Sequence, residues 1–219
     1  MLSLNGLVLA GGRSSRMTRE KALLRVAGPG GRTLISRQLA LLADLGVDRR
    51  ILSVRRDMRW AAPGVTVVHD EVEGLGPIGG IAAAMRLDPA TPLLVLAVDM
   101  PEVDQRILRR LIRRSAPGGG AAPRIGNRWE PLCALYPPGA LETIERMSAD
   151  RQWSPSDLLN RLAREGRMRP LHLTGEARRR LRSWNRPEDV PGRVRAANRW
   201  EGPERNPRRR AQKLQPSAV

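Results

Sequence analysis

The sequence predicts an α/β fold with a mainly parallel sheet, because short apolar runs alternate with amphipathic helical patterns. Four apolar runs have the length and composition of strands, and they lie at residues 6–10, 50–54, 65–68 and 93–98. Between the first two, Thr33 is placed to cap a helix whose apolar residues recur at helical spacing as far as a glycine. A chain of 219 residues is long enough to bury a core around one such sheet.

The second half of the chain continues the alternation. Residues 104–114 place apolar side chains on one stripe and five arginines elsewhere, which predicts a surface helix with one buried edge. Residues 132–136 predict a strand. Ser154, Pro155 and Asp157 occupy the N-cap, first and third positions of a further helix.

Two segments are expected to lack regular structure. Residues 116–126, APGGGAAPRIG, are rich in glycine and proline and predict a flexible turn region. From about residue 191 onward, proline and arginine dominate without apolar periodicity, which is typical of disorder. The expected organisation is one folded domain over residues 1–190 and a basic, disordered tail over residues 191–219.

The net charge of +17 is spread along the sequence and would attract any polyanion, so it limits the class of partner only weakly. The single cysteine, Cys133, excludes a disulfide or a cysteine metal site within the chain and fits a reducing compartment. No apolar stretch approaches the roughly 20 residues of a membrane span, and the N-terminus lacks the pattern of a signal peptide. We therefore expect a cytoplasmic monomer that acts neither on membranes nor on nucleic acid, with an acidic partner protein as a candidate ligand of the tail.

One glycine-rich stretch, GLGPIG at residues 74–79, matches the G-x-G-x-x-G pattern of dinucleotide-binding folds. A helix and a strand follow it, and Asp99 lies at the spacing of the acidic residue that contacts a ribose. In that fold, however, the first glycine turns directly off the first strand, whereas here HDEVE stands between strand and glycine. Pro77 also lies inside the turn, and both departures disfavour a dehydrogenase.

The other glycine-rich stretch, LAGGRSSRMTREK at residues 9–21, does turn directly off the first predicted strand. Two adjacent glycines allow a backbone to approach a phosphate closely. The donors that follow them suit a triphosphate; they are Arg13, Ser14, Ser15, Arg16 and Lys21. No G-K-[ST] triplet is present, so this is not a Walker A loop, and a β-turn with a solvated basic loop is the alternative.

Lys21 argues for the phosphate interpretation. Among the 39 basic residues of this arginine-rich chain, only Lys21 and Lys213 are lysines. A compact ammonium group can reach one phosphate oxygen where the broad guanidinium fork does not fit, which gives a physical reason for lysine at this position.

These residues resemble a known family. LAGGRSSRM followed by EKALL is similar to the N-terminal signature of the nucleotidyltransferases that include molybdenum cofactor guanylyltransferases. Four further blocks resemble the family in the same order, namely HDEVEGLGPIGGIAAAMR, LAVDMPEVD, EPLCALYP and NRPEDV. Together the five blocks span about residues 4–190, although sugar-phosphate nucleotidyltransferases share the first.

The resemblance implies a Rossmann-like, three-layer fold and a set of site residues. Catalytic roles are implied for Arg16, Lys21 and Asp99, with Asp99 also the ligand of Mg²⁺. Nucleotide contacts are implied for Leu9, Ala10, Gly11, Gly12, Arg13, Lys21, Asp70 and Asp99. On the acceptor side the implied residues are Gly76, Pro77, Gly79, Gly80 and Asn185. Asp99 follows a strand, where open α/β sheets place their ligands.

The implied activity is Mg²⁺-dependent transfer of GMP from GTP to molybdenum-molybdopterin, with release of pyrophosphate. Two motifs depart from the family. Thr18 and Glu20 stand where G-x-D-K is common, and Ser183 and Arg186 replace the first asparagine and the threonine of N-x-N-T-P. The alternatives are therefore a related transferase that uses CTP or another phosphorylated acceptor, and a nucleotide-binding protein that has lost turnover and works through its basic tail.

Overall fold

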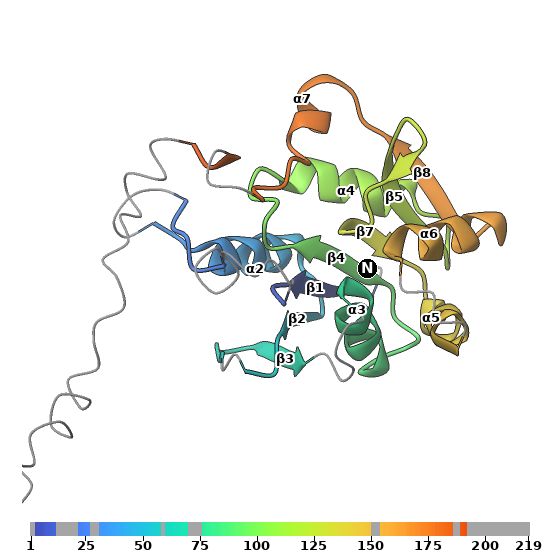
Figure 1. The fold of residues 1–219 in the computed structure, drawn as a ribbon, viewed down its shortest axis with the longest axis horizontal. Helices are drawn as coiled ribbons and strands as arrows, with labels where there is room; N and C mark the ends of the chain where they lie inside the picture. The colour runs from blue at the N-terminus through green and yellow to red at the C-terminus, as the bar shows by residue number, and fades with distance from the viewer. Residues whose placement is uncertain are drawn as a thin grey trace, which may run out of the picture.

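The computed structural model describes residues 3–11, 22–26, 31–57, 60–69, 76–149, 154–185 and 189–191. Its strands are β1 (Asn5–Leu9), β2 (Arg49–Val54), β3 (Val65–His69), β4 (Leu93–Ala97), β5 (Gly120–Ile125), β6 (Arg128–Trp129), β7 (Cys133–Tyr136) and β8 (Met168–His172). Its helices are α2 (Leu34–Leu45), α3 (Pro77–Arg86), α4 (Gln105–Arg114), α5 (Ala140–Ala149), α6 (Pro155–Arg164) and α7 (Gly175–Arg179). Within these residues, helices and strands alternate through the first half of the chain as the sequence predicts, except that β3 follows β2 with no described helix between them (Figure 1).

The described strands form one sheet in the order β3-β2-β1-β4-β7-β5-β6, and β8 pairs with β5. Strands β3, β2, β1 and β4 are mutually parallel, and β5 is parallel to β8. Strand β7 is antiparallel to β4 on one side and to β5 on the other. Because these four strands are parallel, their carboxyl ends lie at the same edge of the sheet. The strand order reverses at β1, which lies between β2 and β4, and open α/β sheets bind ligands at such a point.

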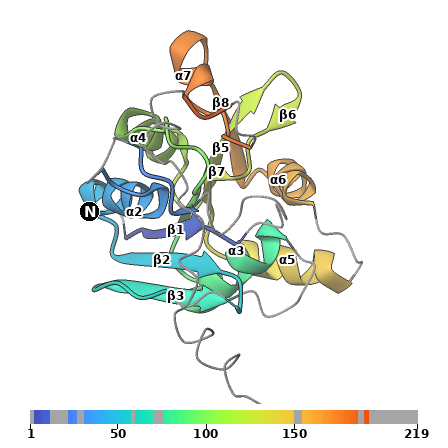
Figure 2. The ribbon, with the colours of Figure 1, turned by 60° about the vertical axis from the view of Figure 1, so that its left-hand side comes forward.

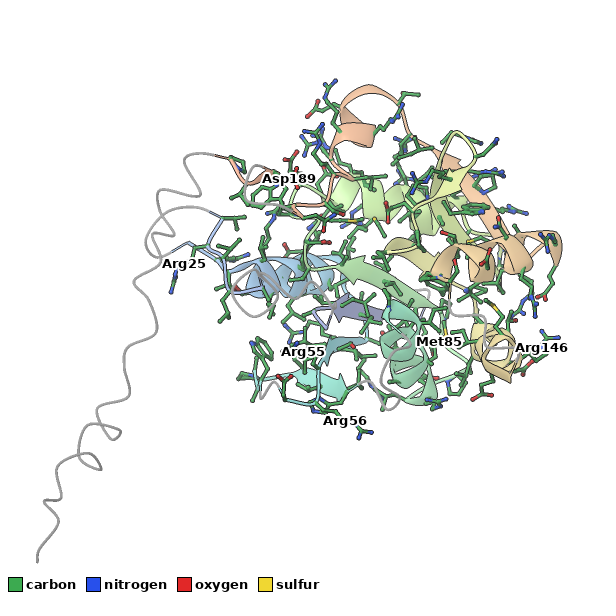
Figure 3. The ribbon with its side chains drawn as sticks, in the orientation of Figure 1. Arg25, Arg55, Arg56, Met85, Arg146 and Asp189 are labelled. Atoms are coloured by element: carbon green, nitrogen blue, oxygen red, sulfur yellow. The ribbon has the colours of Figure 1, made fainter. Side chains whose placement is uncertain are left out.

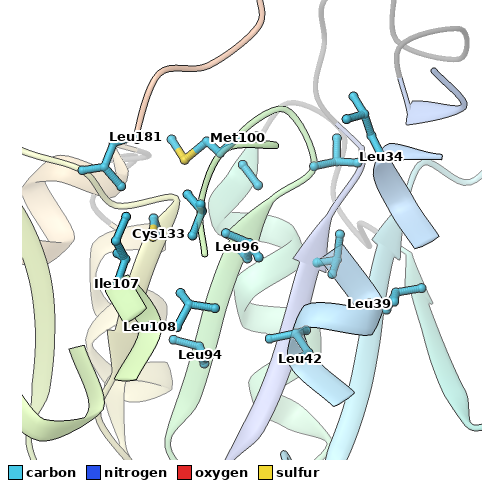
Figure 4. Packing of buried hydrophobic residues seen from close by; sticks show 14 of the residues in the cluster. Leu34, Leu39, Leu42, Leu94, Leu96, Met100, Ile107, Leu108, Cys133 and Leu181 are labelled. Atoms are coloured by element: carbon cyan, nitrogen blue, oxygen red, sulfur yellow. The ribbon is translucent and has the colours of Figure 1, made fainter. Parts of the chain in front are cut away.

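Helices cover both faces of the sheet, so the fold has three layers. Helices α2 and α4 lie on one face, and α3, α5 and α6 lie on the other (Figure 2). Strand β4 shows why both faces are buried, since Leu94 and Leu96 pack toward α2 and α4 whereas Leu93 and Val95 pack toward α3. Figure 4 shows the first of these two clusters, in which leucines of α2 and α4 meet the sheet.

The helix boundaries follow the capping residues in the sequence. The Thr33 side chain accepts a hydrogen bond from the Ser36 amide at 3.2 Å, and α2 ends at Gly46, whose φ of 74° lies in the left-handed region that glycine tolerates. The Ser154 hydroxyl accepts from the Asp157 amide at 3.3 Å and starts α6 as predicted. At the start of α4, the side chain of Asp104 is the cap rather than the first helical residue.

The prediction of a flexible turn over residues 116–126 is wrong for residues 120–125, whereas residues 116–119 do form a turn, closed by a hydrogen bond from the Gly119 amide to the Ala116 carbonyl oxygen at 2.9 Å. Residues 120–125 form β5, which lies inside the sheet and pairs with β6, β7 and β8. Gly120 is required by close packing, because a Cβ there would meet the Leu135 carbonyl oxygen and lie 2.8 Å from the Met168 side chain. Small residues here reflect a tight fit between neighbouring strands rather than conformational freedom.

The predicted boundary near residue 190 stays a prediction. Val190 is buried in the core cluster, and Pro191 is the last described residue. The rest of the predicted tail lies outside the described residues. No described helix is long and apolar enough to cross a membrane.

Candidate active site at the strand ends

The end of β1 is fixed by both neighbouring strands. The Ala10 amide donates to the Ser53 carbonyl oxygen at 2.8 Å, and the Val98 amide donates to the Leu9 carbonyl oxygen at 3.0 Å. Ala10 is buried, and Gly11 is half-buried where the chain leaves the sheet. The first three residues of the glycine-rich signature therefore leave the sheet from its centre, between β2 and β4.

Asp99 follows β4 at the same edge and is half-buried. Its backbone carbonyl oxygen accepts a hydrogen bond from the Trp184 amide at 2.8 Å, and its carboxylate oxygen Oδ1 is buried. Asn185, which follows Trp184 in the chain, is exposed, and its backbone amide donates to Asp189 Oδ2 at 2.9 Å. The fold thus brings together two sequence-predicted residues, Asp99 and Asn185, from distant parts of the chain.

Two adjacent side chains of α2 donate hydrogen bonds to the turn that contains Asp99. Gln38 is fully buried, and its Nε2 donates to the carbonyl oxygens of Met100 at 2.8 Å and Ala97 at 3.3 Å. Arg37 Nε donates to the Pro101 carbonyl oxygen at 2.6 Å. Sequence reasoning missed both residues, although a glutamine in the apolar stripe of a predicted helix was a usable signal.

The predicted acceptor-side residues Gly76, Pro77, Gly79 and Gly80 lie at the start of α3. Gly76 has φ of 58°, and its missing side chain would project into open space. Gly80 instead faces the sheet, where a Cβ would meet the Ser53 hydroxyl and lie 2.9 Å from a Leu9 methyl group. Gly80 lets the helix pack closely on β1 and β2, whereas Gly76 and Pro77 form the end of α3 that lies at the ligand edge.

Glu130 is a second carboxylate near this edge that sequence reasoning did not select. It precedes β7, and its Oε1 accepts from the Leu132 amide at 3.3 Å, while the Leu132 carbonyl oxygen accepts from the Ala97 amide at 2.7 Å. Burial raises the pKa of Glu130, and the negative charge of Asp99 acts in the same direction.

Five predicted site residues lie outside the described residues; they are Gly12, Arg13, Arg16, Lys21 and Asp70. Their roles stay predictions. Leu9, Ala10, Gly11, Gly76 and Asp99, in contrast, all lie at the carboxyl edge of the parallel strands, where the sequence predicts them.

The donor set at this edge fits a hard divalent cation. Carboxylate oxygen is the donor that Mg²⁺ prefers, and proteins commonly hold that ion through one or two carboxylates together with phosphates of a substrate. Asp99 supplies such a carboxylate at a strand end. No three His, Cys, Asp or Glu side chains gather among the residues that the structure describes. A metal there would therefore take few protein ligands from this part of the chain.

An open α/β sheet whose chain leaves β1 through Gly11 and carries a carboxylate after β4 is typical of the α/β proteins that bind ligands at the carboxyl ends of their strands. Residues 6–168 match the MobA-like NTP transferase domain family. The chain belongs to this family and is a nucleotidyltransferase, as the five sequence blocks predict.

Curated relatives extend the match over most of the chain. A protein of Opitutus terrae described as a probable molybdenum cofactor guanylyltransferase is 39% identical over 190 residues, which cover 85% of this chain and 93% of the relative. The molybdenum cofactor guanylyltransferase of a Pseudomonas putida strain is 32% identical over 185 residues, covering 83% and 93%.

Solved structures share the fold. Molybdopterin-guanine dinucleotide biosynthesis protein A of Archaeoglobus fulgidus aligns with a TM-score of 0.64 at 22% identity, over 89% of this chain and 96% of that one. The 2-C-methyl-D-erythritol 4-phosphate cytidylyltransferase of Thermus thermophilus aligns with a TM-score of 0.59 at 18% identity, over 84% and 94%. The fold is therefore shared by proteins named for different nucleotides.

Proposed function

We propose that this chain transfers GMP from GTP to molybdopterin carrying molybdenum, forming the guanine dinucleotide cofactor and pyrophosphate in an Mg²⁺-dependent reaction. The observation that carries the proposal is the position of Asp99. It lies at the carboxyl edge of the parallel strands, between the end of β1 at Gly11 and the segment of Trp184 and Asn185. The names of relatives at 31% to 39% identity support the choice of GTP and molybdopterin.

The reaction needs no protein nucleophile. An oxygen of the acceptor's terminal phosphate attacks the α-phosphorus of GTP, and the bond from that phosphorus to the oxygen bridging to the β-phosphate breaks. Pyrophosphate leaves with the electron pair of that bond. Catalysis then consists of holding two anions in line and compensating their charge.

Each site residue takes a role in that task. The backbone of Leu9, Ala10 and Gly11 would lie against the base and ribose, while Lys21, Arg13 and Arg16 would hold the phosphates. Bound Mg²⁺, held by Asp99, would supply further positive charge at the phosphates. Gln38 keeps the Asp99 turn in place through the carbonyl oxygens of Ala97 and Met100.

The acceptor would enter beside Gly76, Pro77 and Asn185. Because Ser183 and Arg186 depart from the family pattern at this side, another phosphorylated acceptor is the second candidate. CTP is the second candidate for the nucleotide, since the fold alone also serves a cytidylyltransferase.

The test is pyrophosphate release from GTP, CTP, ATP or UTP with molybdopterin as acceptor, with and without Mg²⁺. We expect Mg²⁺-dependent release with GTP at least about tenfold faster than with the other three, the discrimination that one or two hydrogen bonds to the base supply. If pyrophosphate release were faster with CTP than with GTP, CTP would take the place of GTP in the proposed reaction. Absence of release with all four nucleotides would contradict the proposed reaction.

A further inference from the structure

The fold gathers arginines that the sequence spreads along the chain. Helix α4 buries Ile107, Leu108 and Leu111 and turns its arginines away from the core. The end of α7 meets the start of α4, where Arg180 Nη1 donates to Asp104 Oδ2 at 3.0 Å, and Figures 1 and 2 show α7 at that end of the molecule. Both segments are rich in arginine; these residues are Arg106, Arg109, Arg110, Arg113, Arg114, Arg178, Arg179, Arg180 and Arg182.

A groove of about 690 Å³ opens beside Arg180, between the start of α2, the turn after β4 and the segment that contains α7 and the residues after it. We call it the arginine groove, after the five arginines that line it; they are Arg32, Arg37, Arg179, Arg180 and Arg182. Two glutamates, Glu102 and Glu176, also line it. A neighbouring hollow of about 510 Å³ shares Arg179 and Arg182, adds Arg178 and has no acidic residue in its lining.

Most of the positive charge in the arginine groove is uncompensated. Arg180 is paired, with Glu176 at 2.6 Å and with Asp104. Arg37 donates to backbone carbonyl oxygens and forms no ion pair among the described residues, although Asp104 and Glu102 lie near enough to act on its charge. The guanidinium groups of Arg179 and Arg182 make no hydrogen bond or ion pair with any other residue that the structure describes, and both side chains are exposed.

The arginines also repel one another. Burial lowers the pKa of Arg37, and the positive charges of Arg180 and Arg32 act in the same direction, against the opposing effect of Asp104 and Glu102. A bound anion would relieve this repulsion, which is a source of binding free energy that a neutral ligand does not have.

The shape and composition narrow the class of anion. Two hollows joined by shared arginines form an extended surface, longer than a single phosphate needs. Proteins that bind single-stranded nucleic acid offer aromatic rings for stacking, but Trp184, the aromatic residue of the groove, is only 4% exposed. Membrane binding uses exposed apolar side chains, and the large exposed apolar residues among those described, Leu23 and Leu87, line neither hollow.

We propose that the arginine groove binds an acidic segment of a partner protein. Carboxylates spaced along such a segment can pair with Arg179, Arg182 and Arg32 at once, and the neighbouring hollow extends the path. Pro101 and Trp184 belong both to the groove lining and to the surroundings of Asp99, so the partner would lie next to the strand-end site. This inference does not depend on which nucleotide or acceptor that site uses.

The experiment measures binding of a fluorescein-labelled peptide of alternating glutamate and serine to the full chain, by fluorescence anisotropy at physiological ionic strength. The groove variant is Arg179→Glu with Arg182→Glu. The control variant is Arg146→Glu with Arg164→Glu, which makes the same change in net charge on α5 and α6. Figure 3 labels Arg146, which lies on the part of the molecule away from α7.

We expect the groove variant to bind the peptide at least about tenfold more weakly, and the control variant to lose less than about threefold, because only the former reverses charges in direct contact. Equal losses in the two variants would show attraction by net charge alone and overturn the proposal, as would no loss in either. Thermal unfolding of both variants checks folding. If the groove variant is destabilised, Arg179→Gln with Arg182→Gln replaces it, with the same expectation in direction.

Two further probes test the other classes of partner. One is an oligothymidylate of equal negative charge, and the other is vesicles containing anionic phospholipid. Tighter binding of either probe than of the peptide, lost specifically in the groove variant, would overturn the acidic protein segment as the occupant. Binding of both probes that is weaker than the peptide, or equally affected in the two variants, supports it.

Discussion

The strand-end site and the arginine groove adjoin at Pro101 and Trp184, yet they hold charge in opposite ways. At the site, one carboxylate, that of Asp99, sits on a backbone fixed by a buried glutamine and by the Trp184 amide. In the groove, several guanidinium groups lie close together with few acidic partners. The difference is one of arrangement, because the strand-end site holds a single carboxylate on a fixed backbone, whereas the groove collects several exposed cations from separate parts of the chain.

The largest effect is expected at Asp99. Asp99→Asn keeps the shape of the side chain but removes the charge that holds a divalent cation, so pyrophosphate release should fall at least about a hundredfold in a folded protein. Asp104→Asn is the matched control, because asparagine also caps a helix, and its release should stay within about threefold of wild type. Undiminished release from Asp99→Asn would move the metal site elsewhere, with Asp70 the next candidate.

Lys21 should show the next largest effect. Lys21→Ala should lose about 1.5 to 3 kcal/mol of nucleotide binding free energy, the size of a charge-assisted hydrogen bond. Lys21→Arg should also bind nucleotide weakly, because the guanidinium fork has a different geometry. Titration calorimetry with GTP measures both, and Arg25→Lys is the control outside the proposed phosphate contacts. Wild-type affinity in Lys21→Arg would remove our reason for the lysine.

A substitution of Gln38 tests whether the site depends on the hydrogen bonds that this uncharged side chain donates to the turn at Asp99. Gln38→Met has a similar volume but removes the side-chain donor to the carbonyl oxygens of Ala97 and Met100, which keep only their longer backbone hydrogen bonds. The free energy of unfolding should therefore fall by about 0.5 to 1.5 kcal/mol. The turnover number should fall more than nucleotide affinity, because the turn carrying Asp99 loosens. Gln105→Met, at the start of α4, is the control. Loss of affinity alone would argue against a positioning role for Gln38.

Glu130 should give a smaller effect that depends on pH. Its raised pKa means that the folded state favours the neutral carboxyl, so this stabilisation is complete below the ordinary glutamate pKa and is lost as pH rises through the folded-state pKa. Glu130→Gln should therefore stabilise the protein near neutral pH by less than about 1 kcal/mol and give no gain in acid. Thermal unfolding of both proteins, from acid to neutral pH, measures this difference in stability. A gain in stability that does not vary with pH would refute the electrostatic explanation.

The smallest effect is expected from the tail. A chain ending at Pro191 should keep its unfolding midpoint and its pyrophosphate release, because residues 192–219 have no apolar pattern with which to pack. The same truncation separates the tail from the arginine groove as a binding surface for the acidic peptide. Loss of turnover at saturating substrate would place the tail in the active site and move the domain boundary.

The sequence predicted the parallel half of the sheet well, because local signals decide it. The caps at Thr33 and Ser154 and the apolar runs of β1 to β4 are all short-range patterns. Strand β5 was missed because Gly120 and the alanines after it are explained only by strands that follow later in the chain. The glycine and alanine content of this stretch suggested a flexible backbone, whereas the fold requires small residues there so that neighbouring strands can pack closely.

Residues of the candidate site could be predicted from the sequence only where they belong to a recognisable motif. Asp99 and Asn185 were selected from separate blocks, and the fold brings their segments together. Gln38 and Glu130 belong to no motif; they act through carbonyl oxygens and a neighbouring carboxylate, whose positions depend on tertiary packing. The arginine groove was likewise hidden, since its arginines come from two stretches of sequence that lie about 140 residues apart, residues 32–37 and 179–182.

The hydrogen bond from the Trp184 amide to the Asp99 carbonyl oxygen also sets an order of assembly. A chain emerging from the ribosome can pair β1, β2, β3 and β4 from its first hundred or so residues, as domains begin to fold from their N-terminal parts. The Asp99 turn receives its last backbone contact only when residue 184 has been synthesised and docks. A nascent or prematurely terminated chain could therefore form most of the parallel half of the sheet while still lacking the hydrogen bond that Trp184 donates to the turn at Asp99.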